Sequence, residues 1–154
     1  MTSPSRVPEL IDAFIAALEA SADLDGVQIV DGPLVTDSAA TEWVFVGYDG
    51  DPDGEFMTTQ TTQQWAGLGA KAKSEDIALV CSVLVRRGST DVKACRMRTF
   101  AIFGAVEAVV RANPSLGLPP PTICSVAEHT FHTEQTDRGI QGRMPFTLTS
   151  STRI

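Results

Sequence analysis

Three aspartates at alternate positions have the clearest potential for chemistry in this chain. Asp49, Asp51 and Asp53 precede Gly54, the spacing with which a calcium loop opens, because alternate carboxylates can converge on one hard cation. The twelfth position of such a loop normally supplies a bidentate glutamate, but here it is Gln60. The competing interpretation is a solvated turn, in which aspartate and glycine serve turn geometry. We favour the turn, expect no cofactor, and keep the three aspartates as the only metal candidates.

The other residue types that carry out catalysis are sparse. His129 and His132 are the only histidines, and on a strand their spacing places them on opposite faces, so they do not share a metal there. Cys81, Cys95 and Cys124 lie far apart and are odd in number, which favours reduced thiols in the core over a disulfide framework or a zinc site. The chain contains no G-x-S-x-G sequence. We therefore expect no enzymatic activity.

Basic residues gather at the start of an expected helix. Lys93, Arg96 and Arg98 lie there, and Arg86 and Arg87 precede them. Positive charge is unfavourable at the beginning of a helix because it opposes the helix dipole. In a chain of net charge -7, salt bridges to a neighbouring acidic subunit are the expected use of these cations. Aromatic interleaving, which would favour nucleic acid, is absent from this cluster.

Large apolar side chains stand out within a polar segment, residues 55–72, that is rich in threonine and glutamine. They are Phe56, Met57, Trp65 and Leu68. Exposed aromatic side chains on loops often anchor interfaces, so these four are interface candidates. The alternative, that they pack back onto their own domain, stays open.

Periodicity predicts the elements that must position these residues. We expect, in order, a helix over Val7–Ala20, strands over Val27–Val30 and Glu42–Tyr48, a long acidic and polar loop excursion over 49–72, a strand over Asp76–Arg86, a helix over Asp91–Ala112 and a β-hairpin over 122–149. The second arm of that hairpin alternates, with Ile140, Met144, Phe146 and Leu148 on one face. Asp76–Arg86 is apolar on both faces, which is typical of a central strand.

These elements predict one α+β domain spanning 1–154, with residues 1–5 as a loose N-terminus. The expected architecture is a two-layer sandwich, in which two main helices pack on one face of a mixed, mostly antiparallel sheet of four to five strands. The acidic balance, with a pI of about 4.7, argues against a protein that grips DNA phosphates. No apolar run is long enough for a membrane span, and no signal peptide is expected.

The order of elements and several short phrases resemble the tail terminator proteins of long-tailed bacteriophages, the family that includes the terminator of phage lambda. The phrases are Asp31-Gly32-Pro33-Leu34-Val35, Trp43-Val-Phe-Val-Gly-Tyr-Asp-Gly50, Thr136-Asp-Arg-Gly-Ile140 and Phe146-Thr-Leu. The stretch from Val46 to Gly50 looks most like terminators from phages of actinobacteria. The likeness covers nearly all of the chain, and the family has no catalytic signature.

The resemblance implies a structural protein of the virion tail or neck, assembled in the host cytoplasm. It implies a hexameric ring that caps the tail tube, ends its polymerisation and joins the tube protein to the head-side connector, while genomic DNA passes through the lumen without specific binding. Rings of the lambda type are thought to respond to magnesium. In this chain, Asp49, Asp51 and Asp53 are the only residues that would account for such a response. Two alternatives remain: another neck component, such as a head-closure or connector protein, and a small metal-binding domain that uses the acidic loop.

Overall fold

A long antiparallel pair of strands forms the centre of the molecule. The computed structural model describes residues 3–33, 39–69 and 71–154. β4 (Lys73–Arg87) and β7 (Gly139–Arg153) pair from Ser74↔Arg153 to Arg87↔Ile140. Alternate apolar residues of both strands face the main core. Cys81 and Phe146, for example, lie opposite each other in the ladder, and both belong to that core. This ladder is long enough for different strands to flank its two halves.

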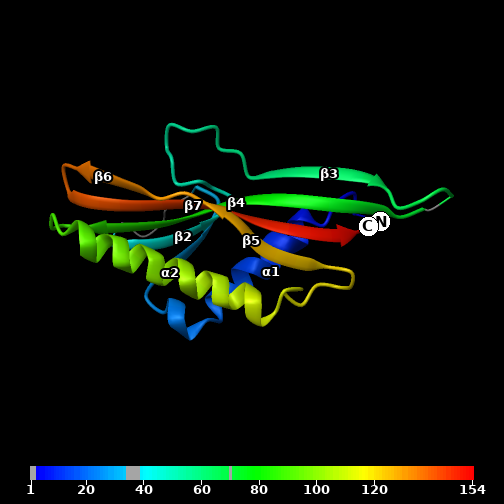
Figure 1. Ribbon diagram of the computed structural model, residues 1–154, viewed down its shortest axis with the longest axis horizontal. Coiled ribbons are helices and arrows are strands. Elements are labelled where there is room, and N and C mark those ends of the chain that lie inside the picture. The colour runs from blue at the N-terminus through cyan, green and yellow to red at the C-terminus, as the bar shows by residue number, and fades with distance from the viewer. Residues whose placement is uncertain (1–2, 34–38, 70) are drawn as a thin grey trace.

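The flanking strands divide between the two halves of the ladder (Figure 1). One half is bordered by β3 (Thr59–Trp65) on β4 and β5 (Ile123–His129) on β7; the other is bordered by β2 (Glu42–Val46) on β4 and β6 (His132–Thr136) on β7. β1 (Gln28–Asp31) pairs in parallel with β2, and all other pairs are antiparallel. The result is one mixed seven-stranded sheet.

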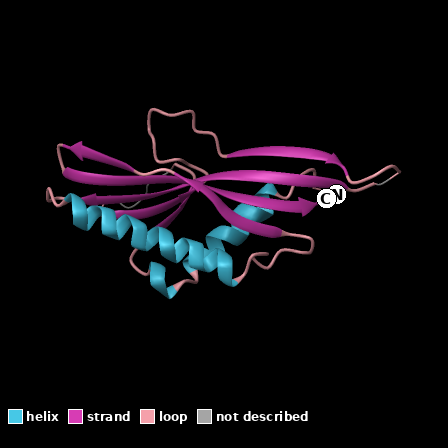
Figure 2. Ribbon diagram, viewed as in Figure 1, coloured by secondary structure: helices cyan, strands magenta, loops and turns pink. Residues whose placement is uncertain are grey.

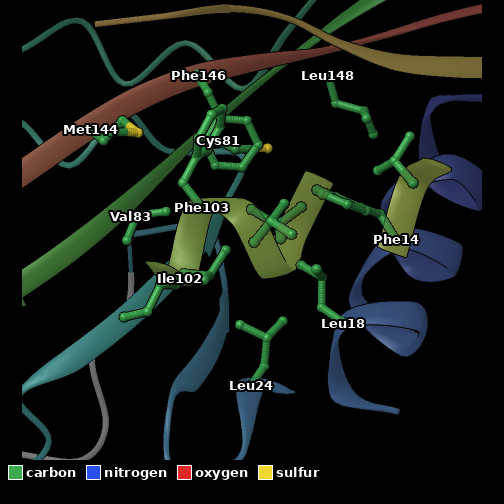
Figure 3. Packing of buried hydrophobic residues seen from close by; sticks show 14 of the residues in the cluster. Phe14, Leu18, Leu24, Cys81, Val83, Ile102, Phe103, Met144, Phe146 and Leu148 are labelled. Carbon is green, nitrogen blue, oxygen red and sulfur yellow. The ribbon is translucent and has the colours of Figure 1, made fainter. Parts of the chain in front are cut away.

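Both main helices cover one face of this sheet (Figure 2). They are α1 (Val7–Glu19) and α2 (Val92–Ala112), and a short 3-10 turn, η1 (Ala22–Leu24), follows α1. Leu10, Phe14 and Leu18 of α1 are fully buried, and burial of each such side chain contributes about 1.5–3 kcal/mol. They pack with apolar side chains from α2, β4 and β7 in the main core (Figure 3). The expected α+β sandwich is confirmed.

The sheet has more strands than the four to five expected, partly because β3 lies within the 49–72 segment that was expected to be a loop excursion. β3 pairs with the half of β4 that β2 does not reach, from Thr59↔Leu79 to Trp65↔Lys73. Its side chains are mostly exposed, so no hydrophobic periodicity marks it in the sequence. Threonine nevertheless favours extended backbone, and the free edge of β4 supplies the hydrogen bonds.

A proline also raises the strand count by dividing the first arm of the terminal hairpin into β5 and β6. The carbonyl of Pro145 on β7 accepts a hydrogen bond from Thr130 N–H at 3.0 Å, so this edge of Pro145 faces the first arm. The N–H and C=O groups of one strand residue point toward the same neighbouring strand. Because proline has no N–H to donate, the first arm loses one hydrogen bond opposite Pro145. Pairing therefore lapses at Thr130 and Phe131 and resumes at His132.

The expected loose N-terminus is attached to the sheet where it is described. The carbonyl of Pro4 accepts a hydrogen bond from Gln63 Nε2, and Ser5 Oγ accepts one from the backbone N–H of Val7. Residues 1–2, residue 70, and Leu34 and Val35 of the quoted phrases lie outside the described residues. Among the helices of the described chain, none is long and apolar enough to cross a membrane.

Candidate assembly surfaces

The acidic loop folds into consecutive turns that its own side chains stabilise. Asp49 Oδ1 accepts a hydrogen bond from Asp51 N–H, and Asp51 Oδ1 accepts one from Asp53 N–H, both at 2.9 Å. These Asx turns use the carboxylates for local backbone geometry. Within residues 3–33, 39–69 and 71–154, no three His, Cys, Asp or Glu side chains are arranged to hold a metal ion. The two hydrogen bonds within the loop therefore favour the turn interpretation of the three aspartates.

The basic cluster separates into internal and external cations. Arg98 binds Glu42 on β2 through two hydrogen bonds, and Arg87 donates a third to the same carboxylate at 2.7 Å. The bonds from Arg98 lower the pKa of Glu42 despite the opposing effect of burial. The hydrogen bond to Glu42 likewise raises the pKa of Arg98. Arg98 therefore has a role within the fold, connecting α2 to β2, which the sequence analysis did not anticipate.

Lys93 and Arg96 differ from Arg98 because both are exposed. Neither forms an ion pair with any described residue. Met97 and Phe100, which the sequence analysis did not select, lie on the same side of α2 and are 62% and 43% exposed. The helical period of apolar residues marks the face of α2 that enters the core. Met97 and Phe100 lie on the opposite, exposed face, so the period did not indicate them. The ring of Phe100 packs edge-on against Phe131, with centroids 5.3 Å apart, and the exposed parts of these four side chains remain available to a partner.

Phe56 and Met57 are about half exposed beside the acidic loop. The ring of Phe56 stacks on Tyr48, with centroids 5.6 Å apart and planes within 3°. Tyr48 belongs to a small cluster with Trp43, Phe45 and Leu84, separate from the main core. Burial, followed by the charge of Asp49, raises the pKa of the Tyr48 hydroxyl. One face of Phe56 is thus held by its own chain while the rest of the ring remains exposed.

Trp65 and Leu68 lie where the chain passes from β3 toward β4, at the end of a hairpin that extends beyond the helices (Figure 1). We call residues 65–69 the hairpin tip. Trp65 is 63% exposed, with Lys73 Nζ 5.0 Å from the centre of its ring, and Leu68 is fully exposed. An exposed tryptophan on a projecting hairpin has the character of an interface anchor.

The histidines and cysteines take part in packing. The ring of His129 lies 4.8 Å from that of Phe103, whereas His132 contacts Thr130 across the break between β5 and β6. Cys81, Cys95 and Cys124 are free and buried, as expected. Burial raises the pKa of all three thiols, that of Cys81 to about 12. Thiolates of this kind are scarce at neutral pH, so none is a ready nucleophile.

An open groove of about 510 Å³ lies between the end of α2 and β5. Its lining includes Val110, Ile123 and Val126, together with Glu107 and Arg111. The last two pair with each other at 3.1 Å, so they do not present converging reactive groups. Ile123 is 63% exposed here, on an edge strand. The groove has the character of a contact surface.

Comparison with known proteins shows a similarity of fold. No known protein family and no curated protein matches the chain. A solved structure described as "Virion of native gene transfer agent (GTA) particle" contains a chain that matches with a TM-score of 0.60 and 12% identity, covering 99% of this chain and 100% of that one. At this identity the likeness shows that the two chains share their fold from end to end.

Proposed function

We propose that this chain is a non-enzymatic structural protein of a phage-like virion. The observation that carries the proposal is the match over 99% of this chain and all of a chain from a gene transfer agent particle. The match extends over nearly all of this chain, so the likeness is one of the complete fold and not of a fragment. The surfaces described above support a role in assembly, since exposed apolar groups gather beside the acidic loop, at the hairpin tip, on one side of α2 and on an edge strand.

Within the virion, we propose the role of tail terminator: a ring of identical copies that caps the tail tube and joins it to the head connector. The order of elements and the short phrases that resemble that family support this role. The sheet also offers several edges, because β1, β3, β5 and β6 each have one side on which no other described strand pairs. Edges of this kind pair readily with neighbouring chains. The hairpin tip adds an apolar projection that a neighbour could cover.

The charge of the chain suits a ring through which DNA moves. A net charge of -7 for each copy repels phosphate, and repulsion prevents DNA from binding to the wall of a channel. We propose that the genome passes through the lumen with no specific contact, and that the tube protein and head connector contact the two ends of the ring. The site of action is then the neck of the virion, after assembly in the host cytoplasm.

The specific role is tested on particles that lack the protein. Deletion of a terminator should give tails much longer than normal and without heads, as seen by electron microscopy, and supply of the intact protein should restore their length. Tails of normal length beside separate filled heads would instead identify a head-closure or connector protein. Calorimetry with Ca²⁺ and Mg²⁺ tests the metal-binding alternative, for which heat and a rise in melting temperature are required.

A further inference from the structure

One face of α2 carries an exposed surface that is both basic and apolar. Lys93, Arg96, Met97 and Phe100 are spaced i, i+3, i+4 and i+7, which places them on one side of a helix. We call them the α2 patch. All four are exposed, and the first turn of α2 contains no acidic residue. The patch therefore combines two positive charges that form no ion pair with a described residue, near the helix end capped by Asp91, with two large apolar side chains.

A second surface has the opposite charge and a similar apolar content. Asp53, Glu55, Phe56 and Met57 are exposed at the end of the acidic loop, and we call them the loop patch. The Asx turns at Asp49 and Asp51 hold the loop in shape before any partner binds, and the stacking of Phe56 on Tyr48 fixes the ring. A preformed surface loses little conformational entropy on association.

The two patches lie on opposite sides of the molecule. The loop rises from the side of the sheet away from the helices, whereas α2 covers the other side (Figure 1). The patches of one copy therefore cannot meet each other. They can meet only between copies, and a contact between two different patches repeats from copy to copy, closing into a ring or continuing as a filament.

We propose that the loop patch of one copy binds the α2 patch of the next copy, so that identical chains associate head to tail. Asp53 and Glu55 neutralise Lys93 and Arg96, while Phe56 and Met57 pack on Met97 and Phe100. The match of both charge and apolar character identifies a second copy as the occupant. This contact rests on the proposed ring, for which it supplies one interface.

Exchange of charges tests the contact. The variants are K93E/R96E and D53K/E55K; Asp49 and Asp51 are left intact because their carboxylates stabilise the loop. Each variant alone should associate at least tenfold more weakly than the wild type in sedimentation. The melting temperature of each dilute variant should not fall below that of the dilute wild type, since acidic residues suit the start of a helix. A mixture of the two variants should associate again, because both contacts between unlike copies are then complementary. The two unchanged patches pair as in the wild type, and the two reversed patches pair with each other. Association of each single variant at wild-type strength, or no recovery in the mixture, overturns the proposal.

Cysteine pairs detect the contact even when it is transient. The native thiols are buried, so a mixture of D53C and R96C should give one disulfide-linked dimer on oxidation. A mixture of D53C and R111C is the matched control, because Arg111 is an exposed arginine at the other end of the same helix. Cross-linking of the first pair at no more than the control rate overturns the contact.

The contact and the proposed function can fail separately. Wild-type oligomers that tolerate the charge reversals and give no specific cross-link would remove this interface and leave the terminator role intact. Specific cross-linking in a protein whose deletion leaves tails at normal length would retain the contact and remove the terminator role.

Discussion

Glu42 and Arg98 lie 56 positions apart in the chain and form an ion pair through two hydrogen bonds, Nε to Oε2 at 2.7 Å and Nη2 to Oε1 at 2.9 Å. The pair joins β2 to α2 and so connects the sheet to the helix layer. This two-bond geometry is what arginine offers a carboxylate and lysine does not. Because of this ion pair, Arg98, which the sequence suggested as a contact for a partner, contributes to the fold of its own chain.

Substitution of Glu42 by glutamine should destabilise the protein by about 1 kcal/mol, a modest cost because solvent screens arginines that are about a third exposed. The pKa of Glu42 is lowered in the folded protein from 4.5. Its contribution is therefore present above about pH 4.5 and disappears as the pH falls through the folded pKa. Denaturant unfolding between pH 7 and pH 3 should show a smaller loss of stability for E42Q than for the wild type. Parallel pH profiles would contradict this.

A buried carboxylate attaches the start of α1 to the sheet. Glu75 is fully buried; Oε1 accepts a hydrogen bond from Arg6 N–H at 2.8 Å, and Oε2 accepts one from Gln63 Nε2 at 2.6 Å. In E75Q, two amide donors face each other, which should cost about 1–3 kcal/mol. The double variant Q63E/E75Q reverses donor and acceptor but loses the hydrogen bond from Gln63 to the carbonyl of Pro4, so it should recover only part of the loss in thermal unfolding. An equal or larger loss in the double variant would argue against this network.

Gly142 permits α2 to approach β7 closely. An added Cβ would lie 2.5 Å from Thr99 Oγ1 and 3.2 Å from Cys95 Sγ. We expect G142A to destabilise the protein by about 1–3 kcal/mol through overpacking. Gly104 on α2 is the matched control, because a Cβ there meets nothing within 4 Å, and G104A should stabilise the helix by about 0.5–1 kcal/mol. Chemical denaturation measures both changes, and a neutral G142A would contradict the close approach.

The three cysteines should be unreactive in the folded protein. Burial raises the pKa of each thiol and blocks access to reagents. Titration with a thiol reagent at pH 8 should find no fast-reacting group in the native state and three after unfolding. One thiol that reacts within seconds in the native state would disprove this packing and would require its removal before the cross-linking experiment.

Trp65 should report on the hairpin tip. Of the two tryptophans, Trp43 is 2% exposed and Trp65 is 63% exposed, so most quenching of fluorescence by iodide should disappear in W65F. W65A should change the free energy of unfolding by less than about 0.5 kcal/mol, since exposed positions contribute little. If the tip is an assembly contact, self-association should nevertheless weaken, and iodide should quench Trp65 less in the oligomer. Unchanged association would leave the tip outside the interface.

The sequence by itself determined the elements whose side chains must enter the core. α1, α2, β2 and β4 occupy nearly the predicted ranges, because burial imposes the periods of helix and strand on apolar residues. The alternation of Ile140, Met144, Phe146 and Leu148 likewise predicted their common buried face on β7. Buried thiols followed from the number and spacing of the cysteines.

Only the tertiary structure decided what depends on partners distant in sequence. β3 is a strand because the edge of β4 is free beside it, and no periodicity of its own polar side chains shows this. The same holds for Arg98, whose role depends on where Glu42 lies. It holds also for Glu75, whose two carboxylate oxygens accept hydrogen bonds from Arg6, just before α1, and from Gln63 on β3. Hydrogen bonds and ion pairs require particular atoms to meet in space, whereas burial requires only a repeating pattern along the chain.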